Sequence, residues 1–314
     1  MHQPNGLKFS TTCLAADLRV HYAEQGNPTG DAIIFHHAYV DSWFSYSRVL
    51  SLLSAEYHAF AFDQRGHGNS DKPDCCYTGD DYADDVDAFM DAVGIEKATL
   101  VGDSSGGMIA QRVALDYPHR VSGLVLIGSP TTLVNNETVI ELGKEMLALE
   151  DPISPEFVRE WVVGMIQHPL PEEFLAGAVS ESLKVPARVW RDYYEGVVLT
   201  VDDTARLGEI GAPTLILWGE QDALLPREEQ ERRAAAIPNA RLKVYPETGH
   251  FAHWVRPEWV VRDLEAFMRG GSRLALCPRH PREVPGTPIV DNSVSGKNPY
   301  RKPGCREEPC SDSQ

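Results

Sequence analysis

The sequence lacks the features that mark membrane-spanning, secreted and metal-binding proteins. No run of eighteen apolar residues occurs, which argues against a membrane-spanning helix. Residues 1–6 contain neither the basic nor the apolar segment of a secretory signal, so we expect a cytoplasmic protein with no membrane partner. The six cysteines show no Cys-x-x-Cys pair and no metal-ligand spacing with histidine. We therefore expect free thiols and no bound metal, with a redox or metal role as the alternative.

Positive charge is also scarce. The 314 residues include 29 Lys and Arg against 46 Asp and Glu, which gives a formal net charge of -17. A surface of this sign repels phosphate backbones and anionic lipid. We therefore expect a small-molecule substrate as the partner and no nucleic acid.

Residues 271–314 differ in composition from the rest of the chain. They are rich in proline and glycine and contain only scattered large apolar side chains. Such a segment cannot bury enough apolar surface to offset the conformational entropy that ordering would cost. We predict a disordered, proline-rich tail and place the fold in residues 1–270.

Short apolar runs alternate with helical patterns along those 270 residues. Near-continuous apolar strands are typical of a parallel sheet that is covered on both faces. The repeated order of strand and helix predicts an α/β protein with a doubly wound, mostly parallel sheet, preceded by a hairpin at residues 7–25. The predicted strands are 32–36, 58–62, 98–101, 121–127, 213–218 and 240–245, and the predicted helices are 79–93, 105–117, 227–236 and 257–268.

Residues 131–211 interrupt this alternation. The segment is helix-rich in pattern, is broken by five prolines, and is too long for a plain connection between strands. We predict a helical cap inserted into a core of residues 1–130 and 212–270. Large apolar side chains of the cap either line a pocket beneath it or pack between its helices, and the candidates are Trp161, Met165, Trp190, Tyr193 and Tyr194.

The clearest chemical motif is Gly-x-Ser-x-Gly at residues 102–106, between a predicted strand and a predicted helix. Its glycines leave room for a sharp turn that lifts the serine clear of the sheet and places it at a helix N-terminus, where developing negative charge is stabilised. Glycines flank Ser104 on both sides, whereas neither Asp103 nor Ser105 is flanked in this way. We predict that Ser104 is a nucleophile.

A serine hydroxyl needs a base that accepts its proton. In strand–turn–helix sites of this kind the acid and then the base follow the serine along the chain. Asp222 and His250 follow the last two predicted strands, at the sheet edge where α/β proteins place their sites. We predict Asp222 as the acid and His250 as the base, with Glu220 and His253 as the alternatives.

Together these motifs resemble those of α/β-hydrolase-fold enzymes over about residues 7–269. Epoxide hydrolases and haloalkane dehalogenases share the resemblance but use an aspartate nucleophile, where this chain has Ser104. Residues 106–111 are similar to a stretch of 3-oxoadipate enol-lactonases, in the serine esterase and lactonase branch. The residues that carry the family resemblance are 102–108, 218–222, 249–250 and the loop 62–70.

The resemblance implies an oxyanion hole made by the backbone N–H groups of Tyr39 and Ser105. Tyr39 lies in the loop after the predicted strand 32–36. Ala38, its neighbour, stands where the family usually has glycine. If that position requires a positive φ, alanine is strained there.

The resemblance further implies a serine hydrolase that cleaves a small carboxylic ester or lactone through an acyl-enzyme, without a cofactor. Two alternatives use the same three residues, namely a C–C bond hydrolase of vinylogous diketones and a cofactor-free perhydrolase. A ligand-binding or signalling protein on the same fold is the alternative from another class, to which Ala38 and the tail point. The sequence leaves the oligomeric state open.

Overall fold

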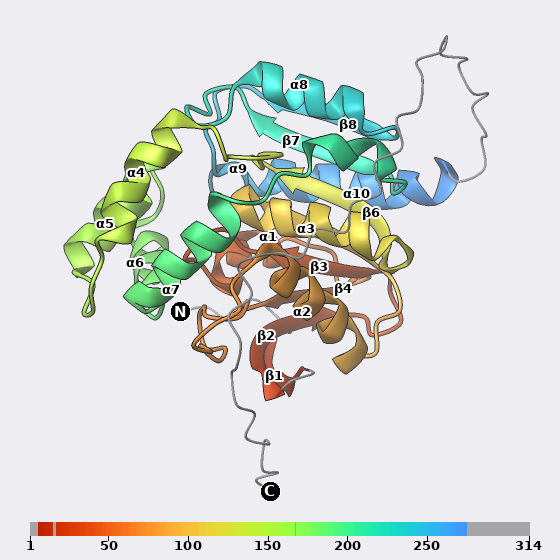
Figure 1. The fold of residues 1–314 in the computed structure, drawn as a ribbon. Coiled ribbons are helices and arrows are strands. Elements are labelled where there is room, and N and C mark those ends of the chain that lie inside the picture. Colours follow the sequence, from red (N-terminus) through yellow and green to blue (C-terminus); the bar gives the residue numbers. More distant parts are fainter. Residues whose placement is uncertain (1–5, 15–16, 167, 275–314) are drawn as a thin grey trace, which may run out of the picture.

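One sheet of eight strands forms the centre of the computed structural model, which describes residues 6–14, 17–166 and 168–274 (Figure 1). The strand order is β1-β2-β4-β3-β5-β6-β7-β8. β1 and β2 pair antiparallel, and the strands from β4 to β8 are joined in parallel. The predicted α/β class with a mostly parallel sheet is confirmed. The strands are β1 (Lys8–Cys13), β2 (Arg19–Gly26), β3 (Ala32–His36), β4 (His58–Phe62), β5 (Ala98–Asp103), β6 (Val121–Ile127), β7 (Thr214–Gly219) and β8 (Ala240–Tyr245).

Helices cover both faces of the sheet. Successive side chains of the parallel strands enter two separate hydrophobic clusters, as Ile33 and Ile34 of β3 do. Burial on both faces is the reason that these strands are apolar almost throughout. The helices of one face are α2 (Gly79–Ala92), α3 (Ser104–Asp116) and α8 (Arg227–Ala236), and those of the other are α1 (Ser47–Leu50) and α10 (Pro257–Leu274).

Local sequence explains where α2 begins and which side it buries. Thr78 caps the helix, and the Thr78 and Asp81 side chains each accept a hydrogen bond from the other residue's backbone N–H. Tyr82, Val86 and Phe89 follow at helical spacing and are buried against the sheet. The cap and the apolar side together hold α2 beside α3, which carries the site described below.

The chain between β6 and β7 forms a group of helices on one side of the sheet core (Figure 1). A proline opens three of them, since Pro155 is the first residue of one helix and Pro171 and Pro186 directly precede two others. Proline suits this position because a helix start needs no N–H donor there. These cap helices are α4 (Glu137–Leu147), α5 (Pro155–Gly164), α6 (Glu172–Ser182) and α7 (Ala187–Tyr193), followed by a π-helical turn at Tyr194–Val198.

The end of the core departs from the prediction. Helix α10 continues to Leu274, four residues into the segment predicted to be disordered. Glycine costs a helix only about 1 kcal/mol per residue, so Gly270 and Gly271 do not end a helix that is anchored upstream. The rest of the predicted tail, 275–314, lies outside the described residues. Within the described ranges no helix is long and apolar enough to cross a membrane.

The cysteines also require a correction. Cys75 and Cys76 form a disulfide, so the expectation of free thiols is wrong for this pair. The two residues are adjacent in a loop in which Cys76 takes a left-handed φ of 72°, which places both sulfur atoms within bonding distance.

Candidate active site

Ser104 lies at the junction of β5 and α3, where the chain makes a strained turn. Its φ is +45°, a conformation that a residue with a side chain rarely adopts. The flanking glycines are required by space, because a Cβ on Gly102 would lie 2.5 Å from the Gly106 carbonyl oxygen. A Cβ on Gly106 would lie 2.3 Å from the His36 carbonyl oxygen. The turn therefore presses the start of α3 against the end of β3 and leaves Ser104 half-buried at the helix N-terminus.

Asp222 and His250 meet at the carboxyl end of the sheet. The Nδ1 atom of His250 is 2.8 Å from Oδ2 of Asp222, and both side chains are buried. The other oxygen of Asp222 accepts hydrogen bonds from the backbone N–H groups of Leu224 and Leu225, at 3.0 and 3.1 Å. Asp222 is thus fixed by its own loop and presents one oxygen to the imidazole.

Close approaches between neighbouring loops bring His250 to this position. A Cβ on Gly219 would lie 2.2 Å from the Gly249 carbonyl oxygen, and one on Gly128 would lie 2.6 Å from that of His250. The loops after β6, β7 and β8 therefore touch through glycines at the edge where Ser104 follows β5. These glycines mark where the loops meet. The prediction of Ser104, Asp222 and His250 from the sequence did not use them.

Ser104 and His250 form no hydrogen bond in the described part of the chain. The Nε2 atom of His250 is buried and has no hydrogen-bond partner there. Phe251, the next residue, lines the same cavity as Ser104. Catalytic hydrogen bonds are often long before substrate binds and tighten in the complex. The unpartnered Nε2 is the atom from which such a bond would form.

The two alternative residues have other surroundings. Glu220 is exposed to solvent at the surface of its loop. His253 is completely buried, with Nε2 3.1 Å from the Ser45 hydroxyl and 3.7 Å from Oδ2 of Asp103. Burial, followed by the nearby His250, lowers the pKa of His253 to about 3, so this imidazole is held neutral. The geometry favours Asp222 and His250 over both alternatives.

The loop after β3 supplies a free backbone donor. The Tyr39 N–H donates no hydrogen bond to a backbone carbonyl in the described part of the chain. Ala38 is not among the residues with positive φ, so the condition under which alanine would be strained there is not met. The strain lies two residues later at Val40, whose φ is +54° although its side chain is β-branched. The positive φ of this loop therefore lies at Val40 and not at Ala38.

Two tyrosines connect this edge of the sheet to the cap. The Tyr39 hydroxyl donates a 2.8 Å hydrogen bond to the Trp190 carbonyl oxygen. The Tyr193 hydroxyl donates a 3.0 Å hydrogen bond to Oγ of Ser105. Both predicted oxyanion residues are therefore held by side-chain contacts to α7, across more than 80 residues of sequence. Nothing in the local sequence could have indicated these contacts.

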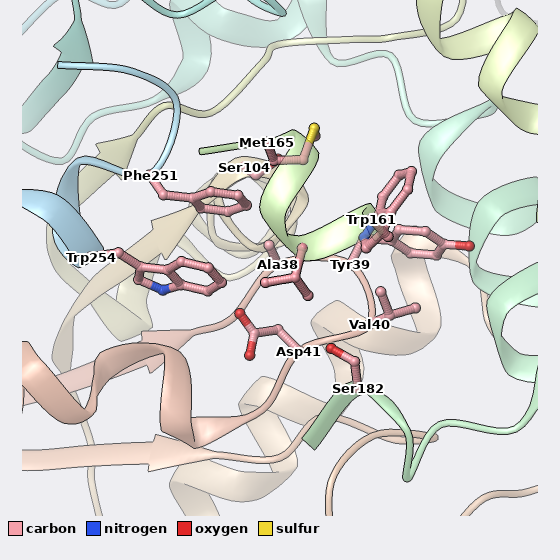
Figure 2. Close-up of a pocket in the computed structure, with 11 residues that line it drawn as sticks. Ala38, Tyr39, Val40, Asp41, Ser104, Trp161, Met165, Ser182, Phe251 and Trp254 are labelled. Atoms are coloured by element: carbon pink, nitrogen blue, oxygen red, sulfur yellow. The ribbon is translucent and has the colours of Figure 1, made fainter. Parts of the chain in front are cut away.

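A narrow cavity of about 40 Å³ opens beside Ser104 (Figure 2). That volume suits a small acyl group of a few heavy atoms. Of the predicted cap side chains, Trp161 and Met165 line the cavity, whereas Trp190, Tyr193 and Tyr194 are buried in packing between the cap and the core. The lining residues are Ala38, Tyr39, Val40, Asp41, Ser104, Trp161, Val162, Met165, Ser182, Phe251 and Trp254.

The cavity is mainly apolar, with a carboxyl group in its wall. Its lining includes no Lys, Arg or His among the described residues. Asp41 is 6% exposed, and burial raises its pKa to about 7. In the same ranges no group of three or more His, Cys, Asp or Glu side chains is arranged to hold a metal ion.

Comparison with known proteins gives the fold and a set of relatives. A family model described as alpha/beta hydrolase fold matches residues 31–161 and 158–257. The chain is 30% identical over 269 residues to a 2-hydroxy-6-oxo-6-phenylhexa-2,4-dienoate hydrolase from Burkholderia cepacia. The aligned region covers 76% of this chain and 87% of the relative.

Solved structures of two further hydrolases share the fold. The esterase RhEst1 from Rhodococcus sp. ECU1013 superposes with a TM-score of 0.74 at 23% identity, over 83% of this chain and 98% of that one. The enol-lactonase from Burkholderia xenovorans LB400 gives a TM-score of 0.66 at 19% identity, over 83% and 100%. At this identity the two structures establish a common architecture and do not establish a common substrate.

Proposed function

We propose that this chain, a hydrolase that belongs to the α/β-hydrolase fold family, cleaves a small carboxylic ester or lactone. Ser104 is the nucleophile, His250 the general base and Asp222 the residue that orients the base. The observation that carries the proposal is the 2.8 Å contact between His250 and Asp222, with Nε2 of His250 left unpartnered at the edge where Ser104 lies.

In the first half of the reaction, Oγ of Ser104 attacks the carbonyl carbon and its proton passes to Nε2 of His250. The Nδ1–H of the imidazole donates to Asp222, which holds the ring in the required tautomer and stabilises the imidazolium. The tetrahedral intermediate then expels the alkoxide, which receives the proton from His250. The acyl group remains on Ser104 as an ester.

Water repeats the sequence in the second half. His250 takes a proton from the water as its oxygen attacks the acyl-enzyme, and then returns a proton to Ser104 as the acid leaves. Both tetrahedral intermediates carry an oxyanion, for which the N–H groups of Tyr39 and Ser105 are the proposed donors. A donor of this kind contributes about 3–4 kcal/mol in comparable sites.

A C–C bond hydrolase of vinylogous diketones is the second candidate, because the Burkholderia cepacia relative is named for a hydroxy-oxo dienoate. A dienoate carries a carboxylate. The cavity beside Ser104 offers no cationic side chain among its described lining residues, and it places the Asp41 carboxyl group in the wall. An anionic substrate would therefore meet repulsion and find no counter-ion, which favours an ester that carries no negative charge.

Hydrolysis assays separate these candidates. We expect wild-type protein to turn over p-nitrophenyl butyrate with a larger kcat/KM than the dienoate substrate of the relative. Replacing the nucleophile in Ser104→Ala should lower kcat by at least about 10³-fold. A strong preference for the dienoate would instead identify a C–C hydrolase. Turnover of neither compound by folded protein would favour the ligand-binding alternative.

A further inference from the structure

We propose that Asp41 is a specificity-determining residue that makes part of the cavity a subsite for a positively charged group of the ester. This inference rests on the proposed ester hydrolysis and names the class of substrate as a small ester that carries an ammonium group. It adds a binding role for a residue that has no part in the proton transfers between Ser104 and His250.

The position of Asp41 gives it access to a bound substrate. It lies two residues after Tyr39 and lines the same cavity as Ser104, together with Ser182 at the end of the cap helix α6. Figure 2 shows the Asp41 carboxyl group between the side chains of Trp254 and Ser182 in this view. An ester held at Ser104 would therefore extend past this carboxyl group.

The charged groups reported to act on Asp41 include no cation among the described residues. Asp63 beyond β4, Asp103 at the end of β5 and Glu181 of α6 are all acidic, and each interacts electrostatically with Asp41. Tyr46 also faces it, with a pKa raised well above the usual range, so this phenol is neutral. His253 beneath the site is neutral as well.

The cap adds a further unpaired oxygen. Oε1 of Glu181 is 2.7 Å from the Lys184 ammonium, but Oε2 is buried without a hydrogen-bond partner in the described structure. Glu181 adjoins Ser182, which lines the cavity. The core thus brings the Asp41 carboxyl group into the lining, and the cap places the Glu181–Lys184 ion pair beside it. Neither brings a cation into the lining among the described residues.

Burial is the main reason that the Asp41 pKa rises, and Glu181 and Asp63 add to it, while hydrogen bonds from Ser45 and from the Ser42 N–H oppose it. A carboxylate in such surroundings is costly unless a positive charge pairs with it. A substrate ammonium group would supply that charge. Its attraction to Asp41 is strong because the site is largely shielded from water.

The charge of Asp41 can be removed with little change of shape. Oδ1 accepts a 2.8 Å hydrogen bond from the Ser42 N–H, and the side-chain oxygen of asparagine can accept the same bond. Asp41→Asn therefore tests the charge while keeping the turn. Asp31→Asn removes one negative charge from an exposed loop and is the matched control.

Two pairs of isosteric esters provide the test. Ethyl γ-aminobutyrate and ethyl pentanoate differ by an ammonium or a methyl group at the end of the acyl chain. Acetylcholine and its carbon isostere, in which carbon replaces the quaternary nitrogen, differ in the same way on the alcohol side. The measured quantity is the ratio of kcat/KM for the cationic ester to that for its neutral isostere, by acid release.

We expect the ratio to exceed about tenfold for at least one pair and to fall to near one in Asp41→Asn but not in Asp31→Asn. In the wild type it should also increase as the pH rises through about 7, because Asp41 then ionises. His250 is the proposed base for hydrolysis of both esters, so its contribution to the two values of kcat/KM cancels in the ratio. The wild-type pH series keeps the test decisive if Asp41→Asn does not fold.

A ratio near one for both pairs at every pH would overturn the inference, as would a preference that persists in Asp41→Asn. The proposed function fails differently. In that case the neutral esters are not hydrolysed at all, or Ser104→Ala hydrolyses them as fast as the wild type.

Discussion

Two pairs of histidine and aspartate lie at the same edge of the sheet, and their histidines are three residues apart. His250 and Asp222 are 2.8 Å apart, and Asp222 receives two backbone N–H groups on its other oxygen. His253 and Asp103 are 3.7 Å apart, and neither oxygen of Asp103 has a hydrogen-bond partner among the described residues. The two pairs contain the same residue types, but only the Asp222 carboxylate accepts hydrogen bonds from backbone N–H groups among the described residues.

The difference in hydrogen bonding to the two carboxylates shows which pair can carry charge during a reaction. A carboxylate that accepts several N–H donors is stabilised in its ionised form and can stabilise an imidazolium. Burial, followed by the charge of Asp41, instead raises the pKa of Asp103 well above its usual range. The second pair is therefore a neutral, buried cluster near Ser104, and we assign it a structural role.

Replacing each histidine should separate the two pairs most strongly. We expect His250→Ala to lower kcat for p-nitrophenyl butyrate by at least about 10³-fold, because the general base is lost. His253→Ala should keep kcat within about tenfold but lower the free energy of unfolding by about 1–3 kcal/mol, since the Ser45 hydroxyl loses a buried partner. Urea denaturation beside the rate assay distinguishes the effects. The reverse order of activities would show that His253 is the base.

Replacing each aspartate should have smaller effects. Asp222→Asn should lower kcat by about 10²–10⁴-fold, whereas Asp103→Asn should keep it within about tenfold. Because the pKa of Asp103 is raised on folding, the unfolded chain releases this proton first, and the contribution of Asp103 to wild-type stability falls as the pH rises above about 4.

Asparagine cannot ionise, so Asp103→Asn should gain stability relative to the wild type as the pH rises above about 4. Denaturation at several pH values measures this difference, with Asp31→Asn as the exposed control. A constant difference across that range would mean that Asp103 is ionised in the folded protein as readily as in the unfolded chain.

Much of the secondary structure of the core could be predicted from the sequence. The predicted strand 32–36 and helix 227–236 have the bounds of β3 and α8. A strand buried on both faces is apolar throughout, so its composition alone marks its ends. The turn at Ser104 could also be predicted from the Gly-x-Ser-x-Gly motif. The structure leaves no room for a Cβ at Gly102 or Gly106, so the turn requires glycine at both positions.

Contacts between distant residues could not be predicted in this way. The bond from Tyr193 to Ser105 spans 88 positions, and no local pattern specifies it. The local sequence offers both His250 and His253 as the base, and the contacts that distinguish them come from distant parts of the chain. His250 contacts Asp222, whereas His253 contacts Ser45 and lies near Asp103. The strain at Val40 belongs to a loop conformation for which the residue itself is unsuited.

Labelling with a fluorophosphonate, followed by mass spectrometry, tests the central claim most directly. The reagent phosphonylates a serine only where a base and an oxyanion site activate it. We predict a single adduct on Ser104 in the wild type, no adduct in Ser104→Ala and greatly reduced labelling in His250→Ala. No adduct on folded wild-type protein, or one on a residue other than Ser104, would contradict the assignment of Ser104, His250 and Asp222.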